Sequence, residues 1–207
     1  MPERRAAISE DVEGLTYVEE FVSGDEERML LDVFDTLDWR PVVMRGQEAK
    51  RTVRHFGLDY DYERGELVPG DPLPAALEPL RDRCAALIER DPADLVQILV
   101  SRYPEGAGIG WHRDAPMFGS RVVGISLGGA CRLQFQRTVD GVRRTHELAL
   151  APRSAYVLAG AARWSWQHHI PPTRELRYSV TFRTLRDTAD LPSGPRPATA
   201  QGGARHP

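Results

Sequence analysis

A histidine and an aspartate near the middle of this chain have the spacing of two metal ligands. The segment reads GWHRD over residues 110–114. In a β-strand, residues i and i+2 share a face, so His112 and Asp114 can reach one metal ion while Arg113 points away. Short histidine–acid pairs are also common in surface loops, so this pair alone is weak support for a metal site.

A pair of histidines near the C-terminal end strengthens that interpretation. The segment reads WQHHI over residues 166–170. His168 or His169 would supply a third ligand, and the spacing leaves both open, because the two point to opposite faces of a strand. Two imidazoles and one carboxylate form the facial triad that holds non-heme Fe(II) and leaves positions for oxygen and a cosubstrate. An enzyme is therefore the leading interpretation.

The segment that follows alternates polar and apolar residues. It reads RYSVTFR over residues 177–183, with the polar side chains on one face of a period-two pattern. Any half-buried strand would show this alternation, but it would not explain why Arg177 and Arg183 stand at the two ends of the polar face. Because arginine binds carboxylates in a bidentate manner, this face predicts a site for an acidic cosubstrate.

Taken together, these segments resemble the AlkB family of Fe(II)/2-oxoglutarate-dependent dioxygenases. The similarity extends from about residue 15 to residue 186, and its specificity comes from the order and spacing of the motifs rather than from any one of them. In chain order the motifs are RTVRHFG at 51–57, Tyr103-Pro104 with Gly106, His112-x-Asp114, Pro152-Arg153-Ser154, Trp166-x-His168-x-Ile170 and Arg177-x-Ser179-x-Thr181-x-Arg183.

The resemblance implies a set of metal ligands. The family pattern Trp-x-His-x-Ile places a ligand at His168, so His112, Asp114 and His168 are expected to hold Fe(II). His169 stands where many relatives have glycine. We expect it at the rim of the site rather than on the metal.

The resemblance also implies a site for 2-oxoglutarate. Arg177 is expected to pair with the distal carboxylate, and Arg183 to lie near the carboxylate that chelates iron. Tyr103 matches a tyrosine whose hydroxyl touches the cosubstrate, although an ordinary core aromatic is the alternative. Ser179 is also expected at this site, and Ser101 and Ser179 each replace an asparagine while keeping a hydrogen-bonding side chain.

The activity implied by the resemblance is the oxidative demethylation of alkylated nucleobases in DNA or RNA, as in DNA repair, with 2-oxoglutarate and dioxygen as cosubstrates. A base within a duplex would have to be flipped out to react. Two alternatives stay open. The same chemistry could act on a tRNA modification, a protein side chain or a small molecule, and a metal-binding jelly roll without oxidative activity is a third possibility.

The substrate-binding residues are less well defined by the sequence. Relatives that repair methylated bases carry an acidic residue two positions after the iron-binding aspartate, and here that position is Pro116. The segment 39–62 corresponds to a lid over the base. Arg51, Phe56 and Tyr60 are its candidate substrate contacts, and packing of the aromatic rings on the barrel is the alternative.

The other histidines and the cysteines are not expected to take part. His55 and His146 lack a partner at ligand spacing and are expected to have surface or hydrogen-bonded structural roles. His206 lies in the C-terminal tail. Cys84 and Cys131 are far apart without a metal-type spacing, so free thiols are expected.

The composition is that of one ordinary domain. Its 207 residues are 41% hydrophobic and 28% charged, with a formal net charge of −3. Without a bulk basic charge, binding to nucleic acid would depend on a local arginine patch. Neither an apolar stretch of membrane-spanning length nor a signal peptide is evident, so we expect a cytoplasmic, monomeric protein.

The element pattern predicts a mainly β protein, namely a double-stranded β-helix (jelly roll) with flanking helices. The resemblance implies an N-terminal α/β lid segment in addition. A polar lead-in is expected over 1–14 and one dioxygenase domain over 15–186, with the lid at 39–62 and the jelly roll at 96–186. Helices are predicted near 24–37 and from 71 to about 90. The eight predicted strands are 96–103, 109–114, 121–127, 130–136, 144–150, 155–159, 163–169 and 176–184, and the tail from 187 is expected to be disordered.

Overall fold

The structure is a computed structural model that describes residues 6–9, 11–44, 46–61 and 66–186. The expected disordered tail from residue 187 lies outside the described residues, and so does part of the expected lead-in over 1–14.

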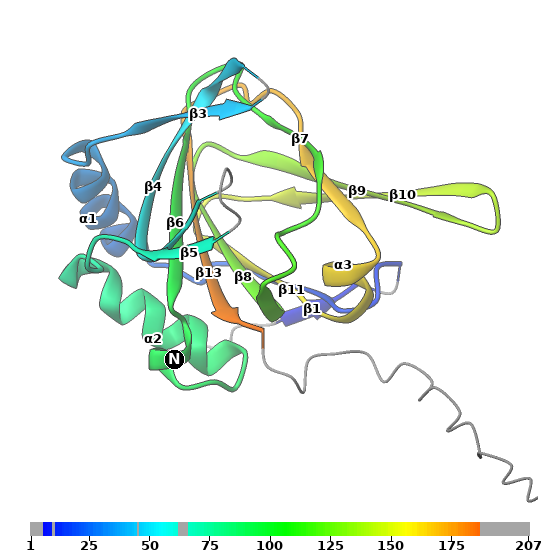
Figure 1. The fold of residues 1–207 in the computed structure, drawn as a ribbon, viewed down its shortest axis with the longest axis horizontal. Coiled ribbons are helices and arrows are strands. Elements are labelled where there is room, and N and C mark those ends of the chain that lie inside the picture. The colour runs from blue at the N-terminus through cyan, green and yellow to red at the C-terminus, as the bar shows by residue number, and fades with distance from the viewer. Residues whose placement is uncertain (1–5, 10, 45, 62–65, 187–207) are drawn as a thin grey trace, which may run out of the picture.

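A large antiparallel sheet forms the back wall of the molecule (Figure 1). Its strands are, in spatial order, β1 (Ala6–Ile8), β2 (Leu15–Val18), β11 (Ser154–Leu158), β8 (Phe118–Gly128), β13 (Arg177–Leu185), β6 (Gln97–Tyr103), β4 (Gln47–Asp61) and β3 (Arg40–Met44), with β5 (Glu66–Pro69) paired to β4. The strand order shows crossovers, as a Greek-key barrel requires.

A smaller antiparallel sheet faces the large one. Its order is β10 (Val142–Leu150), β9 (Cys131–Val139), β12 (Gln167–Ile170) and β7 (Ile109–His112). The hairpin of β9 and β10 extends away from the body of the molecule (Figure 1). The two facing sheets confirm the predicted jelly roll.

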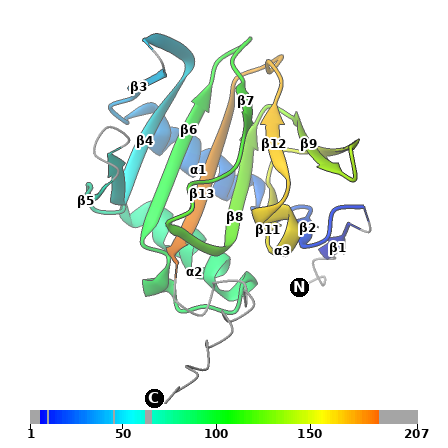
Figure 2. The same cartoon turned by 45° about the vertical axis from the view of Figure 1, so that its right-hand side comes forward.

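Two helices cover the outer face of the large sheet (Figure 2). α1 (Gly24–Asp35) begins at Ser23, whose side chain accepts a hydrogen bond from the Glu26 backbone N–H at 3.2 Å, as the capping pattern predicted. α2 (Glu78–Leu87) follows the 3-10 turn η1 (Ala75–Leu77), and a second such turn, η2 (Pro92–Asp94), leads into β6.

The two faces of the large sheet have different surroundings. Apolar residues of β6 and β13 such as Ile98, Val100 and Phe182 pack with Leu30 of α1 and Leu80 of α2 in one buried core. The intervening residues of the same strands point to the smaller sheet. There they line a cavity of about 50 Å³ between the sheets.

One strand prediction needs correction. The predicted strand 163–169 begins instead as a short helix, α3 (Gly160–Trp164), and β12 starts only at Gln167. Within the expected lid at 39–62, the described residues form β3 and the single 15-residue strand β4. Pairing with both β3 and β6 stabilises this length, and local sequence does not reveal such long-range pairing.

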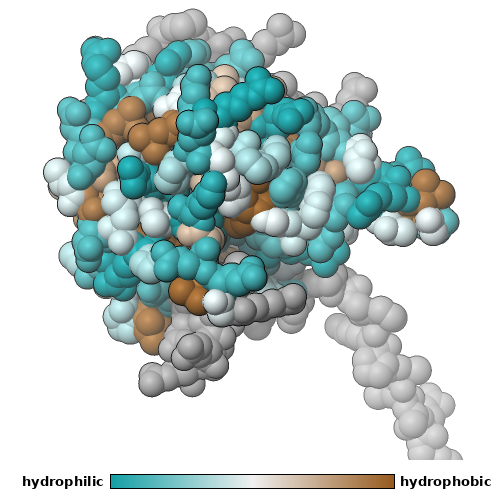
Figure 3. Space-filling model, turned by 90° about the horizontal axis from the view of Figure 1, so that it is seen from above, coloured by the Kyte–Doolittle hydropathy of each residue, from teal (hydrophilic) through white to brown (hydrophobic). Residues whose placement is uncertain are grey.

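The outside of the described molecule is mainly hydrophilic in the view from above, where apolar side chains form separate patches (Figure 3). Among the described residues, no helix is long and apolar enough to cross a membrane. Cys84 and Cys131 are free thiols, as expected.

Candidate metal centre and cosubstrate pocket

The predicted metal ligands come together on neighbouring strands of the smaller sheet. His112 ends β7 and lies directly opposite His168 of β12 in the strand register. Asp114 follows two residues after β7, just before the turn at Pro116 and Met117. The strand pairing therefore brings the two motifs together, although β7 itself is too short to include the aspartate.

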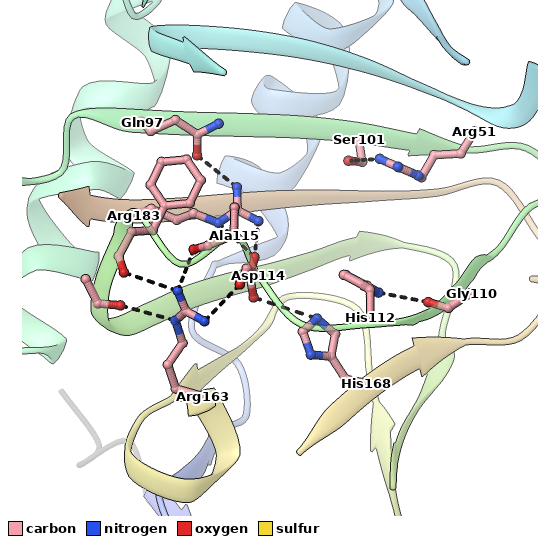
Figure 4. Close-up of polar contacts among 12 residues, drawn as sticks. Arg51, Gln97, Ser101, Gly110, His112, Asp114, Ala115, Arg163, His168 and Arg183 are labelled. Atoms are coloured by element: carbon pink, nitrogen blue, oxygen red, sulfur yellow. Dashed lines mark hydrogen bonds and ion pairs between the residues drawn. The ribbon is translucent and has the colours of Figure 1, made fainter. Parts of the chain in front are cut away.

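The three side chains are adjacent (Figure 4). The side chains of His168 and Asp114 are almost closed off from solvent, and His112 is half-buried. The His112 and His168 rings have centroids 4.2 Å apart. His168 Nε2 lies 3.8 Å from Asp114 Oδ2. His112 Nδ1 lies 2.8 Å from the Gly110 carbonyl, which fixes that nitrogen as the donor and leaves Nε2 for another partner.

The protonation states suit metal binding. Burial lowers the pKa of His168 to about 4 and also lowers the pKa of His112, so both rings are neutral near pH 7. Burial opposes the ionisation of Asp114. The positive charges of Arg183 and the neighbouring side chains outweigh that effect and hold the pKa of Asp114 well below its usual value.

Other residues of the chain hold two of the candidate metal ligands by hydrogen bonds: Gly110 binds His112, and Arg183 binds Asp114. Among the described residues, no group of three His, Cys, Asp or Glu side chains is arranged, as it stands, to hold a metal ion. The donor set itself, two neutral imidazoles and one carboxylate, is that of a non-heme Fe(II) site, so the residues fit this metal.

Two arginines bind Asp114: Arg183 contacts its side chain, and Arg163 contacts its backbone carbonyl. Arg183 contacts Oδ1 of its carboxylate through Nε at 2.9 Å and through Nη2, and donates from Nη1 to Gln97 Oε1 at 2.8 Å. The expected contact of Arg183 with the iron-chelating carboxylate of a cosubstrate stays a prediction. In the structure, this arginine contacts the carboxylate of Asp114, which is itself a predicted metal ligand.

Arg163 of α3 holds the backbone that carries Asp114 (Figure 4). It is 2% exposed and donates to four carbonyl oxygens, two in the loop after β7 and two at the start of β8. The distances are 3.1 Å to Asp114, 2.8 Å to Ala115, 3.2 Å to Phe118 and 3.2 Å to Gly119. The sequence analysis missed this residue, because α3 was predicted to be part of a strand.

Arg177 presents two buried donor nitrogens that suit a carboxylate. It is fully buried, and its Nε donates to Ser126 Oγ at 3.1 Å. Its Nη1 and Nη2 have no hydrogen-bond partner among the described residues. A buried guanidinium without a counter-charge is costly, and a carboxylate bound bidentately would remove that cost. The residues therefore fit 2-oxoglutarate.

Tyr103 and Ser179, the other two expected cosubstrate residues, line the cavity with the metal ligands. The guanidinium carbon of Arg177 lies 5.0 Å from the centre of the Tyr103 ring, so the tyrosine is part of the same site rather than of a remote core.

The expected substrate contacts divide between cavity and core. Arg51 lines the cavity, and its Nη1 donates to Ser101 Oγ at 3.2 Å. The prediction for Phe56 is wrong. It pairs with Ile98 on the helix-facing side of the sheet and is 3% exposed, so it points away from the cavity. Pro116 is exposed in its turn.

Tyr60, the remaining substrate candidate, lies in β4, but its side chain is outside the described residues. His169 lies beside the site, as expected: its Nδ1 is 2.6 Å from the Ile109 carbonyl, and its ring packs on Trp111 at a centroid distance of 4.9 Å. His55 contacts Asp59, and His146 lies 3.3 Å from Asp11, so both have structural partners.

A jelly roll with this triad and a buried arginine defines the class of non-heme iron oxygenases. The chain belongs to the 2OG-Fe(II) oxygenase superfamily, whose family model matches residues 14–186. It is AlkB-like within that superfamily, and it is an enzyme of the dioxygenase class. The alternative of a jelly roll without oxidative activity is thereby set aside.

Three comparisons place the chain more closely. It is 31% identical over 170 residues to the tRNA (carboxymethyluridine(34)-5-O)-methyltransferase alkbh8 of Xenopus tropicalis, covering 78% of this chain and 26% of the frog protein. It is 29% identical over 185 residues to the alkylated DNA repair protein ALKBH8 homolog of Arabidopsis thaliana, covering 78% of this chain and 51% of that protein. The chain thus spans about a quarter to a half of these relatives.

The third comparison concerns the fold. The solved structure of OsALKBH1 superposes with a TM-score of 0.66 at 15% identity, covering 87% of this chain and 100% of that one.

Proposed function

We propose that this chain binds Fe(II) and 2-oxoglutarate and oxidises alkyl groups on nucleobases of DNA or RNA. The observation that carries the proposal is Arg177. Its two terminal nitrogens are buried without a partner among the described residues. Its guanidinium lies against Tyr103, which lines the same cavity as His112, Asp114 and His168. The AlkB-like family membership supports the nucleic-acid substrate.

The bound iron and cosubstrate would supply the oxidising power. The chain's own residues would do the rest. His112, Asp114 and His168 would hold the metal, and Arg177, oriented by Ser126, would bind the distal carboxylate. The apolar part of the cavity wall would exclude water from the reacting atoms; it consists of Leu99, Ile109, Val122, Leu133, Leu158 and Ile170.

The test measures succinate and formaldehyde from the purified chain with Fe(II), 2-oxoglutarate and a panel of methylated DNA and RNA oligonucleotides. Formaldehyde stoichiometric with succinate on one of these oligonucleotides would support the proposal. Succinate formation that no oligonucleotide stimulates would argue against a nucleic-acid substrate. An Asp114→Ala variant provides the background rate.

A second candidate is oxidation of a modified tRNA nucleoside. Pro116 favours it, because it is exposed and has no acceptor for the exocyclic amino group of a methylated base. The relatives named for tRNA modification in frog and mouse also favour it. A panel of tRNAs carrying different wobble modifications would distinguish the two candidates by mass shift. The expected cytoplasmic location and monomeric state stay predictions, which cell fractionation and size-exclusion chromatography would test.

A further inference from the structure

Tyr156 occupies an unusual place in the cavity wall. It lies on β11 directly opposite Gly124 of β8, and its ring crosses over that glycine. A Cβ at position 124 would overlap Cζ and Oη of the tyrosine. The glycine is therefore required for the ring to lie flat against the sheet and extend into the space between the sheets.

The strand register places this ring between the two ends of the proposed cosubstrate site. Along β8 and β13 the facing pairs are Ser126 with Ser179, Gly124 with Thr181 and Val122 with Arg183. Arg177 donates to Ser126 at one end, and Arg183 holds Asp114 at the other. The Gly124–Thr181 pair, against which Tyr156 lies, is between these two ends. A molecule that contacts both Arg177 and the predicted metal ligands must therefore extend past Tyr156.

The hydroxyl of Tyr156 is available to such a molecule. Tyr156 lines the cavity, and its hydroxyl has no hydrogen-bond partner among the described residues. Burial raises its pKa, so the phenol stays protonated and can donate. Of the charged groups around it, Arg177 acts on it most strongly. If the side chain served only to fill space, phenylalanine would do so without the cost of a buried polar group.

We propose that Tyr156, placed by Gly124, is a specificity-determining residue for the cosubstrate: its hydroxyl donates to the carboxylate bound by Arg177, and its ring limits the length of the 2-oxo dicarboxylic acid that fits. This rests on the proposed use of 2-oxoglutarate. The sequence analysis did not identify either residue, because both lie outside the motifs that carry the family resemblance.

The hydroxyl is tested with Tyr156→Phe, which removes one oxygen and keeps the ring. Isothermal titration calorimetry measures the binding of Mn(II) and then of 2-oxoglutarate to the Mn(II)-loaded chain, so no turnover is needed. We expect the dissociation constant of 2-oxoglutarate to rise on the order of tenfold, as for loss of a hydrogen bond to a charged group, while Mn(II) affinity is unchanged.

Tyr17→Phe is the matched control. Tyr17 pairs with Tyr156 across β2 and β11, but its hydroxyl accepts from the Ala151 backbone N–H at 3.2 Å, away from the cavity. Its loss should leave 2-oxoglutarate binding unchanged. An unchanged constant for Tyr156→Phe would overturn the role of the hydroxyl, and tighter binding would mean that the side chain obstructs the site.

The ring is tested with Tyr156→Leu and with 2-oxoadipate, which is one methylene longer than 2-oxoglutarate. The preference for 2-oxoglutarate over 2-oxoadipate should fall on the order of tenfold. Gly124→Ala alone should weaken 2-oxoglutarate binding by displacing the ring. The double variant Gly124→Ala/Tyr156→Leu should match Tyr156→Leu, because the overlap is gone.

An unchanged preference in Tyr156→Leu would overturn the role of the ring. Failure of the wild-type chain to bind 2-oxoglutarate at all would refute the proposed function instead, so the two failures are distinguishable.

Discussion

The two faces of the large sheet are made by the same strands, yet they bury opposite kinds of side chain. On β6 and β13, the buried residues facing the helices are apolar, as in Ile98, Val180 and Phe182. The residues facing the smaller sheet include Gln97, Ser179 and Arg183, and these are also buried. Since burial is similar, the difference in polarity cannot reflect solvent. We therefore interpret the polar face as the ligand-binding face. Many polar groups are buried together only where they form hydrogen bonds, and a bound ligand would supply such partners.

The comparison predicts that changes on the cavity side cost function and changes on the helix side cost stability. The largest effect is expected for Asp114→Ala, which removes the only carboxylate among the three predicted ligands. Metal-dependent formation of succinate should fall to background. His169→Ala, on the outward side of β12, should retain turnover; loss of metal binding in this variant alone would refute the ligand assignment.

The second prediction concerns Arg177→Met, which keeps much of the volume and removes the charge. The apparent Michaelis constant for 2-oxoglutarate should rise by about 100-fold or more, because the buried pair between the arginine and the carboxylate of 2-oxoglutarate is lost. The melting temperature without cosubstrate should not fall, because removing a buried charge whose terminal nitrogens have no partner among the described residues offsets the loss of the hydrogen bond to Ser126. A markedly lower melting temperature would show that Arg177 supports the fold.

The third prediction is the reverse case on the opposite face of β13. Phe182 is fully buried against the helices. Phe182→Ala should lower the free energy of unfolding by about 3–5 kcal/mol, through lost burial and a new cavity. Chemical denaturation measures this. The fraction that remains folded should keep the apparent Michaelis constant of the wild type for 2-oxoglutarate. A large increase in this constant would mean that the two faces of the sheet are coupled.

The two faces also differ in how far sequence reasoning could describe them. Alternation of polar and apolar residues was sufficient to predict most of the strands and the jelly roll. Motif spacing led to His112, Asp114 and Arg177, whereas it left His168 and His169 open and the family resemblance favoured His168. Sequence reasoning failed for Phe56, because parity along β4 can be interpreted only once its register with β6 is known. It also failed for Arg163 and Tyr156. Arg163 contacts the backbone of the loop after β7, and Tyr156 packs on Gly124. Both contacts join residues far apart in the sequence, and no local sequence pattern predicts them.

The smallest predicted effect is the pH dependence of the unliganded chain. Burial lowers the pKa of His168 to about 4, below the value of about 6.5 expected in the unfolded chain. Between these values the unfolded state binds more protons, so stability is complete above pH 6.5 and is lost as the pH falls towards 4. The contribution of His168 is at most about 3 kcal/mol, from 1.36 kcal/mol per pKa unit.

Denaturation of the metal-free chain between pH 7 and pH 4 measures this contribution. His168→Gln should flatten the slope in that window, whereas His169→Gln should leave it as in the wild type. Equal slopes for the wild type and His168→Gln would mean that the imidazole is solvated before metal binds. In that case water would reach the cavity between the two sheets, and the predicted metal ligands would be solvated in the metal-free chain.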